Sequence, residues 1–166
     1  MEGKNRYPHL FEPLHVGRLR FRNRIWSAPM ALTTAFVNKG IIQEKGIIHL
    51  RNRAAGGAAV VELGETAVDF EHAAAHYHTL SLKDPASLPA LTFLADAVHQ
   101  AGAEISLELS HAGLWALPQV NGGNEPIAPV EEVLPGGIRA RAMTEDDMER
   151  VADNFAEAAH FVKNAG

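Results

Sequence analysis

The chain has 166 residues, of which 46% are apolar and 21% charged, as in a single folded domain rather than a disordered chain. Its net charge of −5 argues against a nucleic-acid partner, which needs clustered Lys and Arg, and the absence of cysteine excludes disulfides and cysteine-ligated zinc. No apolar run approaches the ~20 residues of a membrane span, and residues 1–6 lead into no apolar signal core, so we expect a cytosolic protein.

Residues 15–23 form the first predicted element, a hairpin laid across one end of the domain. Arg18, Arg20, Arg22 and Arg24 alternate with apolar residues in this region. A period of two is typical of a strand with one wet face rather than of a phosphate-binding patch. We therefore expect these arginines to face water.

Three apolar segments then alternate with three amphipathic ones. The predicted strands cover residues 25–30, 58–63 and 103–110. The predicted helices run from about 43 to a Gly56-Gly57 stop, from Ser87 as N-cap to Gly102, and from the capping-box sequence Thr144–Asp147 toward Gly166. The residues expected on their buried faces recur at helical spacing: Ile47, Leu50, Arg51 and Ala54; Leu91, Leu94, Ala95 and Val98; Met148, Val151, Phe155, Ala159 and Val162.

Strands that alternate with helices predict repeated βαβ units, an α/β fold and a parallel sheet. Three units do not make a closed architecture, because a (β/α)8 TIM barrel needs eight strands and typically ~250 residues. We interpret residues 1–166 as an incomplete domain, an N-terminal hairpin followed by the first three βα units. The Gly- and Pro-rich stretch 121–141 is a long excursion, and loops of that length are usually functional.

Two glutamates are predicted to face the lumen of such a barrel. The alternation in residues 103–110 puts Ser106, Glu108 and Ser110 on one face and the apolar residues on the other, and Glu62 lies near the end of the preceding strand. Active sites of barrels lie at the C-terminal strand ends, and buried carboxylates need partners. The alternative is that either glutamate simply faces water.

Histidines supply the other candidates. His72, His76 and His78 share a loop with Tyr77 at spacings that could suit a metal, but no acidic or cysteine ligand accompanies them at a characteristic spacing, so a solvated loop over a pocket is favoured. His111 directly follows the third strand, either as a site residue or as a histidine that only satisfies the loop backbone. No complete nucleophile-and-base set is present.

A series of short motifs resembles, in the same order, the opening of old yellow enzyme relatives. The motifs extend over residues 10–166 and are Leu10 to Leu14 with Val16-Gly17, Asn23 to Ile25, Ala28 to Met30, Arg53 to Gly57, Ala97 to His99 with Ala101-Gly102, Leu109 to Gly113, Pro126 to Pro129, and Met143-Thr144. Any one of these motifs is weak, but so many in order are highly specific.

The resemblance implies an eight-stranded (β/α) barrel that carries FMN and reduces activated C=C bonds with hydride from NADH or NADPH. The closer resemblance is to the 2,4-dienoyl-CoA reductase and NADH:flavin oxidoreductase branch. There a 4Fe-4S site and a second, FAD-binding region often follow the barrel. The implied partner is a small-molecule alkene, of enone or enoyl type, and a homo-oligomer is compatible with it.

Particular positions carry implied roles. The resemblance places Ala28, Pro29, Met30 and Ala31 against the flavin near its reactive nitrogen, Gly64 and Glu65 along the flavin, Glu108 at its pyrimidine edge, and Thr33 and His111 on the substrate side. Three positions depart from the family pattern: Ala31 stands where many relatives have Cys or Thr, Glu108 where Gln is usual, and Leu114 where Arg often follows the His-Ala-Gly motif.

The family's substrate-anchoring and proton-donating residues follow the fourth strand, beyond Gly166. We therefore predict no catalytic residue in this chain and little ene-reductase activity from it alone. The alternative is a non-catalytic half-barrel that dimerises or binds a partner and so buries its open sheet edges.

Overall fold

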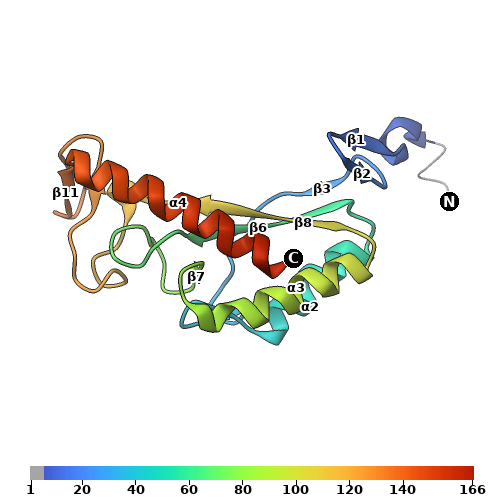
Figure 1. Ribbon diagram of the computed structural model, residues 1–166, viewed down its shortest axis with the longest axis horizontal. Helices are drawn as coiled ribbons and strands as arrows, with labels where there is room; N and C mark the ends of the chain where they lie inside the picture. Colours follow the sequence, from blue (N-terminus) through green and yellow to red (C-terminus); the bar gives the residue numbers. More distant parts are fainter. Residues whose placement is uncertain (1–5) are drawn as a thin grey trace.

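The computed structural model describes residues 6–166, which fold around a short parallel sheet (Figure 1). The strands are β1 (Leu14–Val16), β2 (Leu19–Phe21), β3 (Trp26–Ser27), β4 (Val37–Asn38), β5 (Ile41–Ile42), β6 (Val60–Ala67), β7 (Leu80–Ser81), β8 (Glu104–Ser110), β9 (Ile127–Ala128), β10 (Glu132–Val133) and β11 (Arg139–Ala142). The α-helices are α2 (Glu44–Ala55), α3 (Leu88–Gln100) and α4 (Glu145–Ala165), and three short 3-10 helices are η1 (Pro8–Phe11), η2 (Pro85–Ser87) and η3 (Gly113–Trp115).

Strand β6 is the centre of the parallel sheet. β3 and then β7 pair with one edge of β6, and β8 pairs with the other edge along most of its length. β6 is nearly continuously buried, as expected for a strand covered on both faces. The α/β class, the parallel order and three successive βα units are therefore confirmed.

The predicted strand bounds need correction at two places. The first strand was expected over residues 25–30 but ends at Ser27, because Pro29 has no N–H to donate to a ladder. The second was expected over 58–63 but continues to Ala67, past a β-bulge between Leu63 and Thr66. The hairpin β4–β5 and the short strands β9, β10 and β11 were not predicted.

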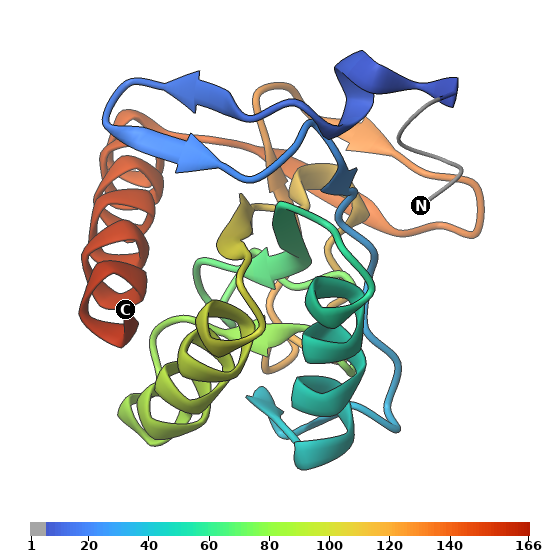
Figure 2. The same cartoon turned by 90° about the vertical axis from the view of Figure 1, so that its right-hand side faces the viewer.

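Helices α2 and α3 lie side by side on one face of the sheet (Figures 1 and 2). The buried face predicted for α3 is confirmed in full. In α2, Leu50 and Ala54 are buried as predicted, but Arg51 is exposed and Gly46 takes its place. Ser87 precedes α3 but caps nothing, because its hydroxyl donates to the carbonyls of Ser81 and Asp84.

Helix α4 begins at the predicted capping box and packs along α3 and β8. The Thr144 side chain accepts from the Asp147 N–H, and the Asp147 carboxylate accepts from the Thr144 N–H. The buried face differs from the expected one: Met148 and Ala159 are exposed, while Asn154 and Ala158 are buried. Among residues 6–166, no helix combines the length and the apolar character that crossing a bilayer requires.

The predicted hairpin is confirmed as β1–β2, at the end of the sheet where the parallel strands begin (Figure 1). Arg22 corrects the expectation that its arginines only face water. The Arg22 guanidinium donates to the carbonyls of Ala54, Ala58 (2.6 Å) and Ala101 (3.0 Å). It thereby ties the hairpin to the C-terminal ends of α2 and α3, where carbonyl groups carry the negative end of the helix dipole.

We expect Arg22→Met to lower the free energy of unfolding by about 1–3 kcal/mol, because it leaves these carbonyls without a charged donor. Urea unfolding of the 166-residue chain measures the change. Arg20→Met is the matched control: Arg20 is exposed on β2, and its replacement should stay within about 0.5 kcal/mol. Equal effects of the two substitutions would contradict the role given to Arg22.

Candidate functional site

The segment that follows β3 presents small and flexible side chains at the end of the parallel sheet. Ala28, Met30 and Ala31 are exposed and Pro29 is half-buried. Arg53, in the last turn of α2, contacts both ends of this segment. Its guanidinium donates to the Ser27 hydroxyl (2.9 Å) and approaches the Met30 sulfur (3.8 Å). The sequence analysis missed this role, although Arg53 is the basic residue next to the Gly56-Gly57 stop.

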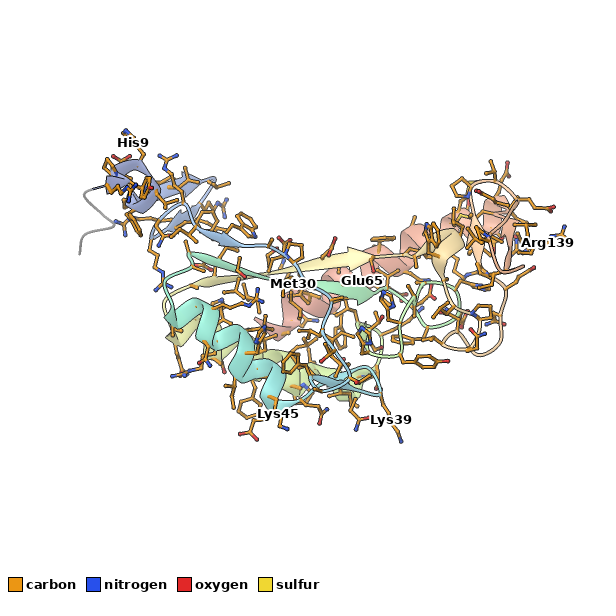
Figure 3. All side chains as sticks on the ribbon, turned by 180° about the vertical axis from the view of Figure 1, so that it is seen from behind. His9, Met30, Lys39, Lys45, Glu65 and Arg139 are labelled. Carbon is orange, nitrogen blue, oxygen red and sulfur yellow. The ribbon has the colours of Figure 1, made fainter. Side chains whose placement is uncertain are left out.

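Gly64 brings three strand ends together. A Cβ atom on Gly64 would lie 2.2 Å from a carboxylate oxygen of Glu108 and 2.6 Å from the Pro29 Cβ. Only a residue without a side chain allows this approach. Pro29, Gly64 and Glu108 are therefore neighbours, from β3, β6 and β8, as the parallel order predicts. Met30 and Glu65 both lie in the middle of the molecule, far from its ends at His9 and Arg139 (Figure 3).

The face of the sheet away from α2 and α3 carries polar side chains. Glu62 accepts hydrogen bonds from the Trp26 indole N–H (2.9 Å) and the Ser106 hydroxyl (3.4 Å). The Ser110 hydroxyl donates to the Thr66 carbonyl. Glu62 thus has the partners that a lumen-facing carboxylate needs, but it lies at the third position of β6 rather than near its end.

The alternation predicted for β8 is confirmed by what packs on its other face. Ile105, Leu107 and Leu109 contact the hydrophobic core shared with the helices. Glu108 itself is exposed. The alternative prediction, that a glutamate faces solvent, therefore holds for Glu108. Its carboxylate lies beside Gly64, where the strand ends meet.

A buried aspartate shapes the loop after β6. One oxygen of Asp69 accepts from the backbone N–H groups of residues 71–73 (2.8–3.1 Å), and the other accepts from the Asn154 amide (2.7 Å). Burial alone would raise the pKa of Asp69, but the N–H donors of this loop and the nearby His111 outweigh it and hold the pKa below its ordinary value. The loop is thereby tied to α4.

Two loops at the C-terminal strand ends are joined to each other. The N–H of Ala112 donates to the Ala73 carbonyl (2.9 Å), and the N–H of Leu117 donates to the Ala74 carbonyl (3.0 Å). The buried Asn121 amide adds bonds to the backbone N–H and carbonyl of Ala74. The loop after β6 and the loop after β8 therefore form one rigid rim.

The structure shows one of the two roles that the sequence left open for His111, the contact with the loop backbone. Its Nδ1 accepts from the Gly113 N–H (3.1 Å), which satisfies the loop backbone. Its Nε2 is buried and has no hydrogen-bond partner among the described residues. Burial lowers the pKa of His111 below its ordinary value, and the Asp69 carboxylate opposes this only in part. Nε2 is therefore a buried nitrogen without a partner in the described part of the chain.

The three histidines of the loop that follows β6, His72, His76 and His78 (the histidine loop), do not converge on one point as metal ligands would. His72 bonds the Glu125 carbonyl through Nδ1 (3.0 Å), whereas His76 and His78 stack with their ring centroids 5.2 Å apart. His76 also lies 3.6 Å from the Glu65 carboxylate. Within residues 6–166, no group of three His, Asp or Glu side chains is arranged to hold a metal ion.

Thr33 lies apart from the pairing of Gly64 with Glu108. It accepts from the Ala35 N–H (3.3 Å) and begins the turn into β4. It lines a hollow of ≈ 120 Å³ together with Met30, Phe36 and His49. The roles given to Thr33 and His111 on the substrate side, and to the other residues on the cofactor side, stay predictions.

Residues 9–166 match the sequence family described as NADH:flavin oxidoreductase / NADH oxidase. The chain belongs to this family. Two relatives are an NADH oxidase from Thermoanaerobacter brockii, 31% identical over 96% of the chain, and an NADPH dehydrogenase from Listeria welshimeri, 30% identical over 95% of it. The chain spans only 24% and 45% of the lengths of these two proteins.

Solved structures of the family share the fold. Morphinone reductase in complex with tetrahydroNAD matches with a TM-score of 0.86 and 25% identity, over 96% of this chain and 47% of its own. The old yellow enzyme homologue from Zymomonas mobilis matches with a TM-score of 0.82 and 28% identity, over 96% of this chain and 46% of its own. The α/β arrangement is thus part of a (β/α)8 TIM barrel, and the old yellow enzyme resemblance is confirmed.

We expect the His111→Asn variant to lose less stability than the wild type on mild acidification. Because burial lowers the His111 pKa in the folded state, the unfolded chain binds a proton first as the pH falls through about 6.5. The wild type therefore loses stability there, by at most about 1.4 kcal/mol per pH unit from this residue. Urea unfolding between pH 8 and 5 measures the free energy of unfolding of both proteins. The free energy of the wild type should fall more steeply than that of the variant as the pH falls.

Asparagine carries its amide oxygen on Cγ, the atom that bears Nδ1 in histidine, so it can still accept from the Gly113 N–H and keep the loop contact. His99→Gln is the control, because His99 is exposed at the opposite end of the sheet. A difference that does not change with pH would contradict the assignment of this acid sensitivity to His111.

Proposed function

We propose that this chain forms one wall of the FMN site of an NAD(P)H-dependent oxidoreductase that reduces activated C=C bonds. Residues 1–166 are then the N-terminal part of an FMN-binding barrel, and turnover belongs to the complete barrel. The substrate is a small electron-poor alkene of enone or enoyl type. The observation that carries the proposal is the meeting of Pro29, just after β3, with Gly64 and Glu108 in the C-terminal halves of the neighbouring parallel strands β6 and β8.

The residues at this place fit a flat aromatic ring. Gly64 has no side chain, and Ala28 and Ala31 have only methyl groups, so backbone atoms can approach a ring face closely. The exposed Met30 side chain offers a polarizable thioether, which packs well against aromatic groups. Arg53 anchors this segment through Ser27 and Met30. Bound FMN would supply the hydride chemistry, and the protein would supply binding and orientation.

Glu108 would occupy the pyrimidine edge of the ring. A carboxylate accepts hydrogen bonds and donates none, so it matches the ring N–H and not the two carbonyl groups that flank it. Gly64 keeps Glu108 close to the wall, because any side chain there would displace the carboxylate. The bound ring would therefore be held by one good hydrogen bond at this edge rather than by two or three.

The first test is flavin binding by the 166-residue chain. We expect a protein-bound visible absorbance band to survive desalting after FMN addition, at up to one FMN per chain. The physical reason is that the small side chains, the Met30 thioether and the Glu108 carboxylate would contact one face and one edge of the flavin ring. Loss of all flavin would mean that these residues do not suffice for binding, and the chain's role as a flavin wall would then need a longer parent chain to support it.

Glu108→Gln gives a sharper test of the orientation. The amide can accept from the ring N–H and donate to a ring carbonyl, so we expect FMN to bind about two- to tenfold more tightly. Fluorescence quenching of titrated FMN measures the dissociation constant. Glu104→Gln is the matched control, because Glu104 lies at the other end of β8. An unchanged affinity in both variants would place Glu108 outside the ring's hydrogen-bonding edge.

Turnover by the 166-residue chain alone should be slow. The chain covers less than half of its relatives' length, and the wall described above encloses only one side of a ring. With FMN, NADPH and 2-cyclohexenone we expect a turnover rate well below the typical enzyme range, which is on the order of 1–10³ per second. Product formation followed by gas chromatography checks this. A rate inside that range would contradict the assignment of turnover to a complete barrel.

A further inference from the structure

A second cleft opens beside the proposed flavin wall. It has a volume of ≈ 550 Å³, within the usual range of small-molecule sites. The side chains that line it come from the end of β6, the histidine loop and the loop after β8: Glu65, Ala75, His76, Ala112, Trp115 and Leu117. The two backbone hydrogen bonds between these loops, at Ala112 and Leu117, fix its walls.

The charge of this cleft comes from Glu65. Its side chain is 25% exposed, and its only ion-pair partner within residues 6–166 is His76, at 3.6 Å. His76 stacks face to face on His78, with an interplanar angle of 3°. The Glu108 carboxylate lies beside Gly64, the residue that precedes Glu65, and adds negative charge.

Trp115 supplies an aromatic face. It lies in the loop after β8, at the end of η3, and 65% of its surface is exposed. Indole faces attract cations, and tryptophan does so more strongly than other aromatic residues. Ala75, Ala112 and Leu117 complete an apolar lining. A carboxylate, an indole and an apolar wall are the groups that recognise an organic cation.

We propose that this cleft binds an organic cation, so that the substrate carries a protonated amine or a quaternary ammonium group. The inference rests on the proposed function for its role in catalysis, because the cleft adjoins the flavin wall through Glu65. The cationic nitrogen lies between the Glu65 carboxylate and the Trp115 ring, and its apolar substituents contact the alanines and Leu117. Ligands whose anionic group would enter the cleft, carboxylates and phosphates included, are disfavoured by Glu65 and Glu108.

Binding to the 166-residue chain without flavin tests this directly. The probes are benzyltrimethylammonium, whose charge does not change with pH, benzyl alcohol as a neutral counterpart and benzoate as an anion. The chain has two tryptophans, so ¹H–¹⁵N spectra show two indole signals, and Trp115→Phe assigns them. We expect saturable shifts of the Trp115 signal with benzyltrimethylammonium, which should bind roughly tenfold more tightly than the other two probes.

Variants separate the two recognition groups. Glu65→Gln should bring the affinities for benzyltrimethylammonium and benzyl alcohol within about twofold of each other, since the amide keeps the shape but removes the charge. Trp115→Leu should weaken cation binding several-fold, and Trp115→Phe should restore part of it. Glu104→Gln, at the opposite end of β8, should change nothing. The backbone amide spectrum of each variant verifies that it is folded.

The outcomes are independent of the flavin measurement. Equal binding of the three probes, or a folded Glu65→Gln variant that keeps the full preference for the cation, would overturn the cation site even if FMN is retained. A selective shift of the Trp115 signal that Glu65→Gln abolishes supports the site even if FMN washes away, in which case only the flavin wall lacks support from this chain.

Discussion

The placement of every candidate residue depends on the pairing of β6 with its neighbours. β3, β7 and β8 all pair with this one buried strand, and all run parallel to it. Parallel pairing brings the C-terminal ends of the strands to the same edge. Two local features then adapt this edge: the bulge after Leu63 redirects β6, and Gly64 lets Pro29 and Glu108 approach it from both sides. Hydrophobic burial of β6 thus determines where the polar chemistry can lie.

Buried polar contacts hold the loops above that edge. Asp69 uses one oxygen for three backbone N–H groups and the other for Asn154 on α4, and Lys83 donates in turn to Asn154 (2.6 Å). Both Asp69 and Asn154 are less than 5% exposed, so an unsatisfied partner would be costly. This network makes α4 a support for the loop that carries His76, although the helix does not reach the site itself.

Much of the architecture could be predicted because hydrophobic periodicity and capping residues act locally. The buried face of α3 and the capping box of α4 follow directly from such patterns. Contacts between distant residues could not be predicted this way. Arg22 lies in a row of alternating arginines, and nothing local shows that it reaches two helix ends. Helical spacing did not single out the buried Asn154, because its partner Asp69 is 85 positions away in the sequence.

The candidate site shows the same division between local and distant information. The neighbouring of Pro29, Gly64 and Glu108 followed from the parallel order. The cleft beside them did not, because it depends on two loops whose backbone bonds join residues about 40 positions apart. Glu65 belongs to both places, since it follows Gly64 in β6 and faces Trp115 across the cleft. A carboxylate there cannot be optimised for one neighbour alone. Its negative charge would attract a cation and would also disfavour added electrons on an adjacent ring, so ligand charge and flavin reactivity should be coupled through this residue.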